Sequence, residues 1–423
     1  MVLVIILLLL EAILFSLGIV FLYRKDKPYA FYFGALYLYS TPPLIGYYFY
    51  PALSIKLSAY FGEEYWFRFY AFTVLSMASF FAFSIMHIKR LEKKKPRRRL
   101  FRFISKGHLK ILALLIVVLG SGVQIVNMIV NADKIGYMKA STANPLTAIS
   151  AILFQISVGS IVILYYFVRS RSRFSINQTM TYIVFAISII TFMVYGIKAG
   201  NRHVLLQVVL GILFVEIGLK KLNRRTLLIY IGVLVLVLVA FQSLRVSRNR
   251  HAVAVSFTLE NLLSNDYYPP AHIMFTAIRY KYIQPLEVLS SNLANSLVGL
   301  GVDYLQAYVM RLIVTIRISR NASYAFFIFA EGFMFMGWWG FLYNGFVPST
   351  LLYVWRRIGK VKDSEYALVL SSILACYSVD FVRGQSSYFV RYLWLYLLPN
   401  MILYACLTGV KKKDELGIDE KRS

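Results

Sequence analysis

The sequence predicts an all-α polytopic membrane protein, and its composition, its apolar stretches and the placement of its basic residues all indicate this class. Of its 423 residues, 59% are hydrophobic and 15% are charged. Soluble domains are about 45–50% apolar and about 25% charged. We therefore expect the chain to lie in a membrane and to cross it with helices.

Apolar stretches long enough to cross a bilayer, which takes about 20 residues, follow one another along the chain. They predict about eleven transmembrane helices, in a range of roughly 10–13, at 2–22, 29–50, 65–88, 110–130, 146–168, 178–197, 203–219, 226–243, 337–355, 365–382 and 387–408. We expect the first to be a spanning helix and not a cleaved signal peptide, because its charges, Arg24-Lys25-Asp26-Lys27, come after it.

Basic residues predict the orientation of these helices. If Arg24–Lys27 is cytoplasmic, the alternating loops 89–110, 169–173, 220–225 and 356–362 and the tail are cytoplasmic too, and together they hold about two thirds of the 46 basic residues. The N-terminus is then outside and the C-terminus inside. Topology and anionic lipids account for the net charge of +27 without a nucleic-acid partner.

The predicted spans divide the chain into four parts. Residues 1–243 carry the first eight helices, 244–336 form a long outer loop, 337–408 carry the last three helices, and 409–423 form a cytoplasmic tail. Within the loop, 286–305 repeats apolar residues at helical spacing, which predicts an amphipathic helix lying on the membrane. Alternatively 293–316 crosses the membrane, and a second crossing near 324–336 restores the topology.

Conventional catalytic signatures are missing from the sequence. There is no HExxH, GxSxG, Walker or GxGxxG pattern, no pair of carboxylates in a DxD arrangement, and no histidine spacing suited to a metal. The sequence predicts neither a metal nor a cofactor. Any chemistry is expected to depend on arginines, isolated carboxylates and a histidine.

Arginines gather on the predicted outer face, where basic residues are normally scarce. Arg202, Arg245, Arg248 and Arg383 are the leading candidates, followed by Arg250, Arg279, Arg317 and Arg320. A cluster of guanidinium groups binds a polyanion, and at a membrane surface we expect a phosphate or pyrophosphate head group. The alternative for each arginine is a solvated loop charge or a contact with anionic lipid.

Candidate general bases lie in the same outer loop. Glu331 stands out because its neighbours are apolar, an environment that tunes a carboxylate for proton transfer. His272 is the second candidate. Their structural alternatives are a carboxylate that pairs with an arginine or caps a helix, and an ordinary loop histidine. The further acids of this loop are Glu260, Asp266, Glu287 and Asp303.

Glycines flank Trp338 and Trp339, where they predict close backbone approach and a sharp bend at the entry to a membrane helix. The two tryptophans are expected to be interfacial anchors, with stacking on a sugar as the alternative. In the first span, Glu11 is expected to pair with a neighbouring helix or to lie near the outer interface.

Three short motifs carry a family resemblance. Gly200-Asn201-Arg202 ends one predicted span, Ala330-Glu331-Gly332 leads through Gly337-Trp338-Trp339-Gly340 into another, and Arg383-Gly384 lies in the last outer loop. With the long outer loop, they resemble the Wzy-type polymerases of bacterial surface polysaccharides, whose overall plan is similar to that of O-antigen ligases. The resemblance covers most of the chain as a layout, with motifs of only a few residues.

The resemblance implies a GT-C-like fold and metal-independent glycosyl transfer at the outer face of the bacterial cytoplasmic membrane. A growing glycan would pass from undecaprenyl pyrophosphate to the non-reducing-end hydroxyl of a lipid-linked repeat unit. Arg202, Arg248, Glu331 and His272 are then expected in catalysis, and the other six arginines in substrate binding. The implied partners are the undecaprenyl-pyrophosphate-linked oligosaccharide, membrane lipids and a chain-length regulator protein.

Two other classes compete with this interpretation. A transporter or flippase of lipid-linked oligosaccharides is expected to contain an internal repeat and broken helices in matching halves, and neither is detected. A structural membrane protein without activity does not need arginines concentrated on one outer face.

Overall fold

The computed structural model describes seven longer stretches of the chain, 2–40, 63–94, 106–130, 145–169, 178–199, 203–219 and 328–359, together with short pieces at 228, 232, 274–275, 277–279, 368–369, 371–377, 395, 398–400 and 402. Almost all of these residues are helical, and none of them is in a strand. The predicted all-α class is confirmed to this extent.

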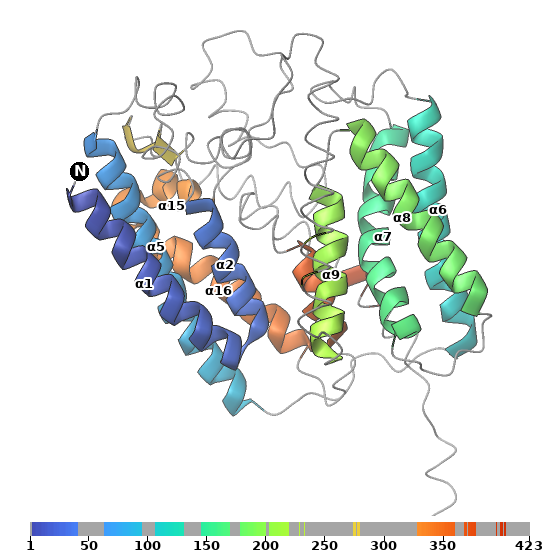
Figure 1. Ribbon diagram of the computed structural model, residues 1–423, viewed down its shortest axis with the longest axis horizontal. Coiled ribbons are helices and arrows are strands. Elements are labelled where there is room, and N and C mark those ends of the chain that lie inside the picture. The colour runs from blue at the N-terminus through green and yellow to red at the C-terminus, as the bar shows by residue number, and fades with distance from the viewer. Residues whose placement is uncertain are drawn as a thin grey trace, which may run out of the picture.

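The labelled helices form two groups that stand side by side (Figure 1). The first group contains α1 (Val2–Lys25), α2 (Lys27–Ser40), α5 (Glu63–Lys93), α15 (Ile328–Met336), the 3₁₀ helix η1 (Gly337–Trp339) and α16 (Gly340–Gly359). The second contains α6 (Lys106–Val130), α7 (Pro145–Arg169), α8 (Gln178–Ala199) and α9 (His203–Gly218). We call the end of the molecule at Val2 the upper end and the end at Lys25 the lower end.

In the first group, α5 and α16 pack against each other along most of their length. They cross closely at Gly345, where a Cβ would lie 2.6 Å from the backbone carbon of Ser79. Helices α1 and α2 form a hairpin beside them, and the Ser40 hydroxyl of α2 donates to the carboxylate of Glu11 in α1. The prediction that Glu11 pairs with a neighbouring helix is confirmed.

The second group has its own interior. The Phe154 ring of α7 stacks on the Phe192 ring of α8 with centroids 3.9 Å apart, and the Ser121 hydroxyl of α6 donates to Ser188 of α8 over 3.3 Å. The Asn400 side chain donates to the carbonyl of Ile156, which ties one of the late helical pieces to α7.

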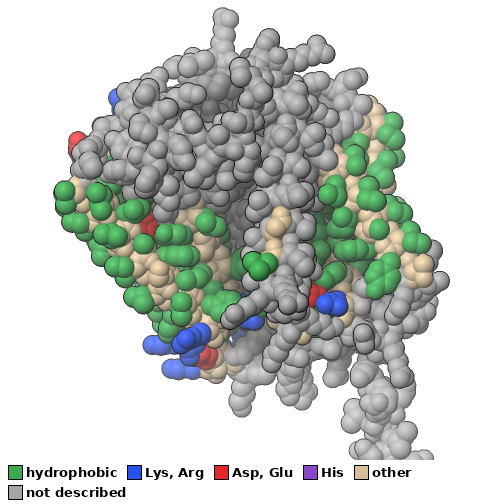
Figure 2. All heavy atoms as spheres, viewed as in Figure 1, with side chains coloured by type: hydrophobic (Ala, Val, Ile, Leu, Met, Phe, Trp, Pro, Cys, Tyr) green, Lys and Arg blue, Asp and Glu red, His purple; other side chains and the backbone are tan. Residues whose placement is uncertain are grey.

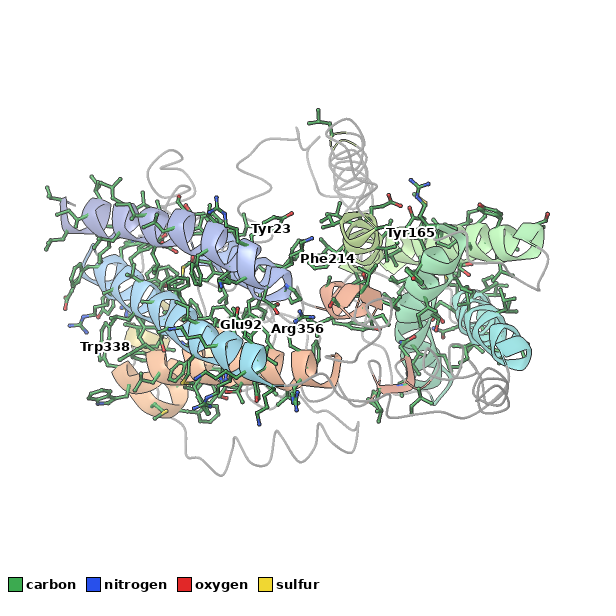
Figure 3. The ribbon with its side chains drawn as sticks, turned by 90° about the horizontal axis from the view of Figure 1, so that it is seen from below. Tyr23, Glu92, Tyr165, Phe214, Trp338 and Arg356 are labelled. Atoms are coloured by element: carbon green, nitrogen blue, oxygen red, sulfur yellow. The ribbon has the colours of Figure 1, made fainter. Side chains whose placement is uncertain are left out.

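The two groups meet at specific contacts. The Phe31 ring of α2 meets the Phe214 ring of α9 edge to face, with centroids 4.4 Å apart. The view from below places Phe214 between the two groups and Arg356 at the end of α16 that faces the second group (Figure 3). Arg356 donates to the Ser371 hydroxyl over 2.9 Å, and the thiol of Cys376 in the same helical piece packs beside Gly211 of α9.

Helix bounds agree with several of the predicted spans. The spans at 2–22, 65–88, 110–130, 146–168, 178–197 and 203–219 each coincide with one helix, and 337–355 corresponds to η1 and α16. Helix α2 covers the first part of the span at 29–50. Two described helices, Val2–Lys25 and Glu64–Lys93, are by themselves long and apolar enough to cross a membrane. Most of 226–243, 244–327 and 365–423 lies outside the described residues.

Basic residues gather at the lower ends of the helices, as Figure 2 shows beneath the first group. Arg24 and Lys25 end α1, Arg90 and Lys93 end α5, and Arg169 ends α7. The outward faces of both groups are covered instead by apolar side chains (Figure 2).

Two partly buried ion pairs lie among these lower ends. Arg356 Nε is 2.7 Å from the carboxylate of Asp26, and Arg169 Nε is 2.7 Å from that of Glu216. The Tyr165 hydroxyl donates to the same carboxylate of Glu216 over 2.6 Å. The first pair joins α16 to the residue between α1 and α2, and the second joins α7 to α9, so both ion pairs add to the packing at the lower end.

Candidate functional site

The upper end of α5 carries a charged pair on an otherwise apolar and aromatic helix. Glu64 and Arg68 are four residues apart, one helical turn, and their side chains form an ion pair. The guanidinium also lies over the Tyr65 ring, 5.9 Å from its centroid. Both charged side chains remain partly exposed. The pair therefore places donors and acceptors at the upper end without burying an unpaired charge.

A sharp corner between α15 and α16 faces this pair. At Gly337 the backbone has a φ of 56°, a left-handed conformation that favours glycine. The two helices then cross so closely that a Cβ on Gly340 would lie 2.1 Å from the carbonyl oxygen of Gly332. The predicted close approach and sharp bend are confirmed. The corner presents Trp338, whose ring is 5.8 Å from that of Phe72 and 6.2 Å from that of Phe333.

The short segment 274–279 covers the upper end of α5. The Phe275 ring packs between two aromatic side chains of α5, with its centroid 4.4 Å from that of Trp66 and 4.6 Å from that of Phe69. This contact brings Ile278 and Arg279 beside the same end of the helix.

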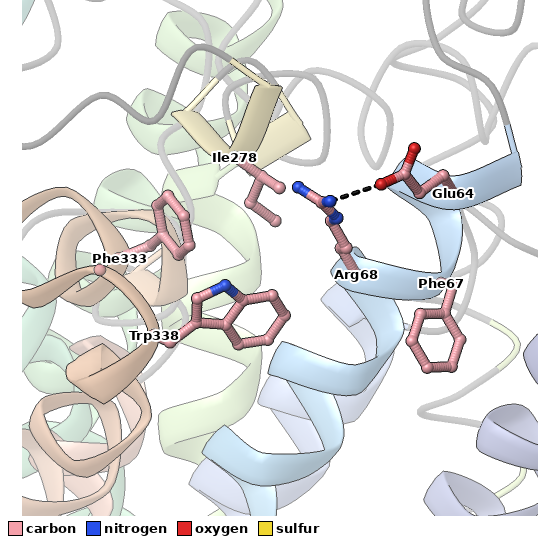
Figure 4. Close-up of a pocket in the computed structure, with 7 residues that line it drawn as sticks. Glu64, Phe67, Arg68, Ile278, Phe333 and Trp338 are labelled. Carbon is pink, nitrogen blue, oxygen red and sulfur yellow. Dashed lines mark hydrogen bonds and ion pairs between the residues drawn. The ribbon is translucent and has the colours of Figure 1, made fainter.

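These three elements line a half-open cavity of about 780 Å³. In Figure 4 the guanidinium of Arg68 and the indole of Trp338 point toward the same space, from α5 and from η1. The cavity is lined by an ion pair and by large apolar side chains, namely Glu64, Phe67, Arg68, Ile278, Phe333, Gly337 and Trp338. Its volume falls within the roughly 300–1,000 Å³ of small-molecule sites.

Glu331 lies in the helix that leads to this corner, and it is completely buried. Its carboxylate is close enough to the hydroxyl of Tyr32, which is also buried, to interact with it electrostatically. Beside it, the Asn344 side chain donates to the carbonyl of Phe329 over 3.1 Å and to the hydroxyl of Ser76 over 3.0 Å. Glu331 is thus part of a polar layer between helices and does not line the cavity.

Two of the site residues predicted from the sequence fall within the described residues, Glu331 and Arg279. Arg279 is exposed and directly follows Ile278 of the cavity wall. The structure therefore brings both to the same region of the upper end. The other candidates lie outside the described residues, namely Arg202, Arg245, Arg248, Arg250, His272, Arg317, Arg320 and Arg383.

The sequence patterns do not single out Glu64 and Arg68, because the predicted span at 65–88 leaves Glu64 in the preceding loop and Arg68 near the start of a helix. A signal was present: opposite charges one helical turn apart begin an apolar helix, in Glu63-Glu64-Tyr65-Trp66-Phe67-Arg68. This spacing favours an ion pair on one face of the helix, and the packing of η1 and of Ile278 around that face forms the cavity.

No known protein family, curated protein or solved structure matches this chain.

Proposed function

We propose that this protein is a polymerase of a bacterial surface polysaccharide that acts in the cytoplasmic membrane. It transfers the growing glycan from undecaprenyl pyrophosphate to the non-reducing-end hydroxyl of a lipid-linked repeat unit. The observation that carries this proposal is the cavity at the upper end, because it combines an aromatic wall with an arginine and lies at the opposite end from the basic lower face.

A membrane location is supported by the outward faces of the helices. Leucine, isoleucine and valine side chains are exposed along α1, α6 and α8, among them Leu3, Leu119 and Ile190. Exposed apolar surface of this extent is unfavourable in water and favourable in lipid. The basic lower ends then belong on the cytoplasmic side, and the cavity opens toward the outer leaflet.

The proposed reaction cleaves the bond between the donor glycan and its pyrophosphate, and the acceptor oxygen forms the new glycosidic bond as its proton passes to a base. Negative charge develops on the departing pyrophosphate. Arginines already in place around it stabilise that charge, and the predicted outer arginines, led by Arg202 and Arg248, are assigned this role. The carboxylate of Glu331 is buried and does not line the cavity, so we assign it to the polar layer beneath the reacting sugars and assign the role of base to His272.

Reconstitution of the purified full chain with a lipid-linked repeat unit tests the proposal. We expect a ladder of elongated products on a gel, with EDTA present throughout. Arg202→Ala and Arg248→Ala should each lower the rate about 100-fold or more, the loss typical for one stabilising donor, and Arg→Lys at either position should restore a part. Lys94→Ala, which removes a charge at the lower end, serves as the control and should retain the full rate.

Failure of the wild-type protein to elongate the repeat unit would overturn the proposed function. Long chains from both alanine variants would instead remove those arginines from the site. In cells, each inactive variant should export single repeat units that are never extended, because their synthesis and flipping come earlier.

A further inference from the structure

The wall of the upper cavity on α5 is electrically neutral. Arg68 contributes one positive charge and Glu64 one negative charge, and the two side chains are paired. A pyrophosphate is bound by an excess of positive charge, which this pair does not supply. A guanidinium carries five N–H donors, and the bond to Glu64 uses only part of them, while the carboxylate keeps acceptor sites. Such a pair suits neighbouring hydroxyl groups, each of which both donates and accepts.

The opposite wall offers an aromatic face. Trp338 is 43% exposed, although Phe72 and Phe333 meet its ring nearly edge to face at interplanar angles of 73° and 79°. These contacts support the indole from α5 and α15 and leave part of it accessible. The face of an indole carries partial negative charge, which attracts the positively polarised C–H groups on one side of a sugar ring.

The next residue provides a natural comparison. Trp339 is more exposed than Trp338, at 67%, but it stacks beside Phe341 and does not line the cavity. Both tryptophans suit an interfacial anchor. Only Trp338 lines the cavity and faces the Arg68–Glu64 pair, so the two tryptophans have different surroundings in the structure.

We propose that the cavity is a sugar-binding subsite, in which Trp338 stacks on a pyranose ring and the Arg68–Glu64 pair binds the hydroxyls of that ring. The inference rests on the proposed function for the identity of its ligand, the neutral sugar portion of the lipid-linked oligosaccharide. It assigns no contact with the pyrophosphate to Trp338 or to the Arg68–Glu64 pair, whose charges cancel. Trp338 and the Arg68–Glu64 pair then contribute to the choice of sugar and not to binding of the lipid carrier.

The purified full chain in nanodiscs is tested for binding of two probes, to show whether Trp338 and the Arg68–Glu64 pair bind the sugar and not the pyrophosphate. One probe is the free oligosaccharide released from the lipid-linked repeat unit by mild acid, and the other is undecaprenyl pyrophosphate without sugar. Trp338→Ala should weaken oligosaccharide binding about tenfold, which is the upper part of the range for one aromatic contact. Trp338→Phe should retain most of the affinity, and Trp339→Ala should retain all of it.

Arg68→Gln provides a second variant on the opposite wall, at a partly exposed side chain whose loss leaves the core of α5 intact. It should also weaken oligosaccharide binding, and neither Arg68→Gln nor Trp338→Ala should change binding of undecaprenyl pyrophosphate by more than about twofold. Equal oligosaccharide affinity in Trp338→Ala and Trp339→Ala would overturn the subsite, and so would a loss confined to undecaprenyl pyrophosphate.

The result of the binding assay can be interpreted separately from the result of the polymerisation assay. If the wild-type protein binds the oligosaccharide through Trp338 but elongates nothing, the subsite stands and the proposed function fails. If the protein elongates repeat units but Trp338→Ala binds and extends them normally, the function stands and the subsite is wrong.

Discussion

At the scale of single residues, the lower end shows how charges are tolerated inside a helical bundle. The carboxylate of Asp26 is 7% exposed and that of Glu216 is 1% exposed, and each has an arginine 2.7 Å away. A buried carboxylate without a partner is far more costly than one that is paired. Loss of either arginine would therefore leave a buried carboxylate without its charge partner.

Removal of one partner should reveal this cost. We expect Arg356→Ala to destabilise the protein by about 3 kcal/mol, because it leaves the Asp26 carboxylate buried without its guanidinium. The double variant Asp26→Asn/Arg356→Ala should recover part of the loss. Thermal unfolding followed with a thiol-reactive dye, which reports exposure of the buried Cys376, measures both.

Lys25 and Glu92 form the matched control, since their ion pair at 3.4 Å is about half exposed on both sides. Lys25→Ala should cost less than about 1 kcal/mol. If Arg356→Ala and Lys25→Ala lowered the melting temperature equally, the buried pair would have no special role in stability.

Residues of the site differ in how well the sequence predicted them. The apolar neighbours of Glu331 point to a buried carboxylate, and the structure buries it fully. Tyr32, with which it interacts electrostatically, is some 300 positions away along the chain, and no local pattern indicates this contact. Arg68 lies near the start of an apolar helix, where a charged residue is typical of a helix boundary and does not by itself indicate a site. Only the packing of 274–279 and η1 around it reveals a cavity.

At the scale of elements, close backbone contact shapes the corner that presents Trp338. Gly332 and Gly340 approach so closely that no side chain fits between them. The glycine-rich sequence predicts a close contact between two helices here, because small residues permit helices to approach each other. The sequence did not indicate which glycines pair, because that depends on the crossing of α15 with α16.

Alanine at one of these glycines tests the corner. Gly340→Ala places a Cβ 2.2 Å from the backbone carbon of Gly332. We expect it to cost about 1–3 kcal/mol of stability, as overpacking does, and to weaken oligosaccharide binding through displacement of Trp338. The measurements are a thermal melt and the binding assay with the free oligosaccharide.

Gly122 in α6 is the corresponding control, since nothing lies within 4 Å of a Cβ added there. Gly122→Ala should stabilise the protein by roughly 0.5–1 kcal/mol, because alanine favours a helix over glycine. A destabilisation by Gly122→Ala as large as that by Gly340→Ala would contradict the account of the corner.

At the scale of the whole molecule, the two ends of the bundle differ in chemistry. Basic residues cluster below, and an aromatic cavity with a neutralised ion pair lies above. The predicted spans imply that successive helices run in opposite directions. The helix ends that lead into the basic loops lie at one face of the molecule, in the part that the structure describes. The arrangement of the two groups could not be predicted, because contacts such as Phe31 with Phe214 join residues far apart in sequence.

Single cysteines at the two ends of α5 test the orientation. In a background that lacks Cys376 and Cys406, a thiol replacing Glu64 should react with a membrane-impermeant reagent added to intact cells. A thiol replacing Lys94 should react only after the cells are opened. The reverse pattern would place the cavity in the cytoplasm and rule out the proposed reaction at the outer leaflet.

One helix connects these two ends, and its length sets their separation. The 31 residues of α5 form a rod about 46 Å long. It packs against α16 along most of that length, including the close approach of Gly345 to Ser79 near its midpoint. A rod of this length matches the roughly 40–45 Å of a bilayer with its head groups, so it is long enough to keep the Arg68–Glu64 pair and the Lys25–Glu92 pair in water at its opposite ends.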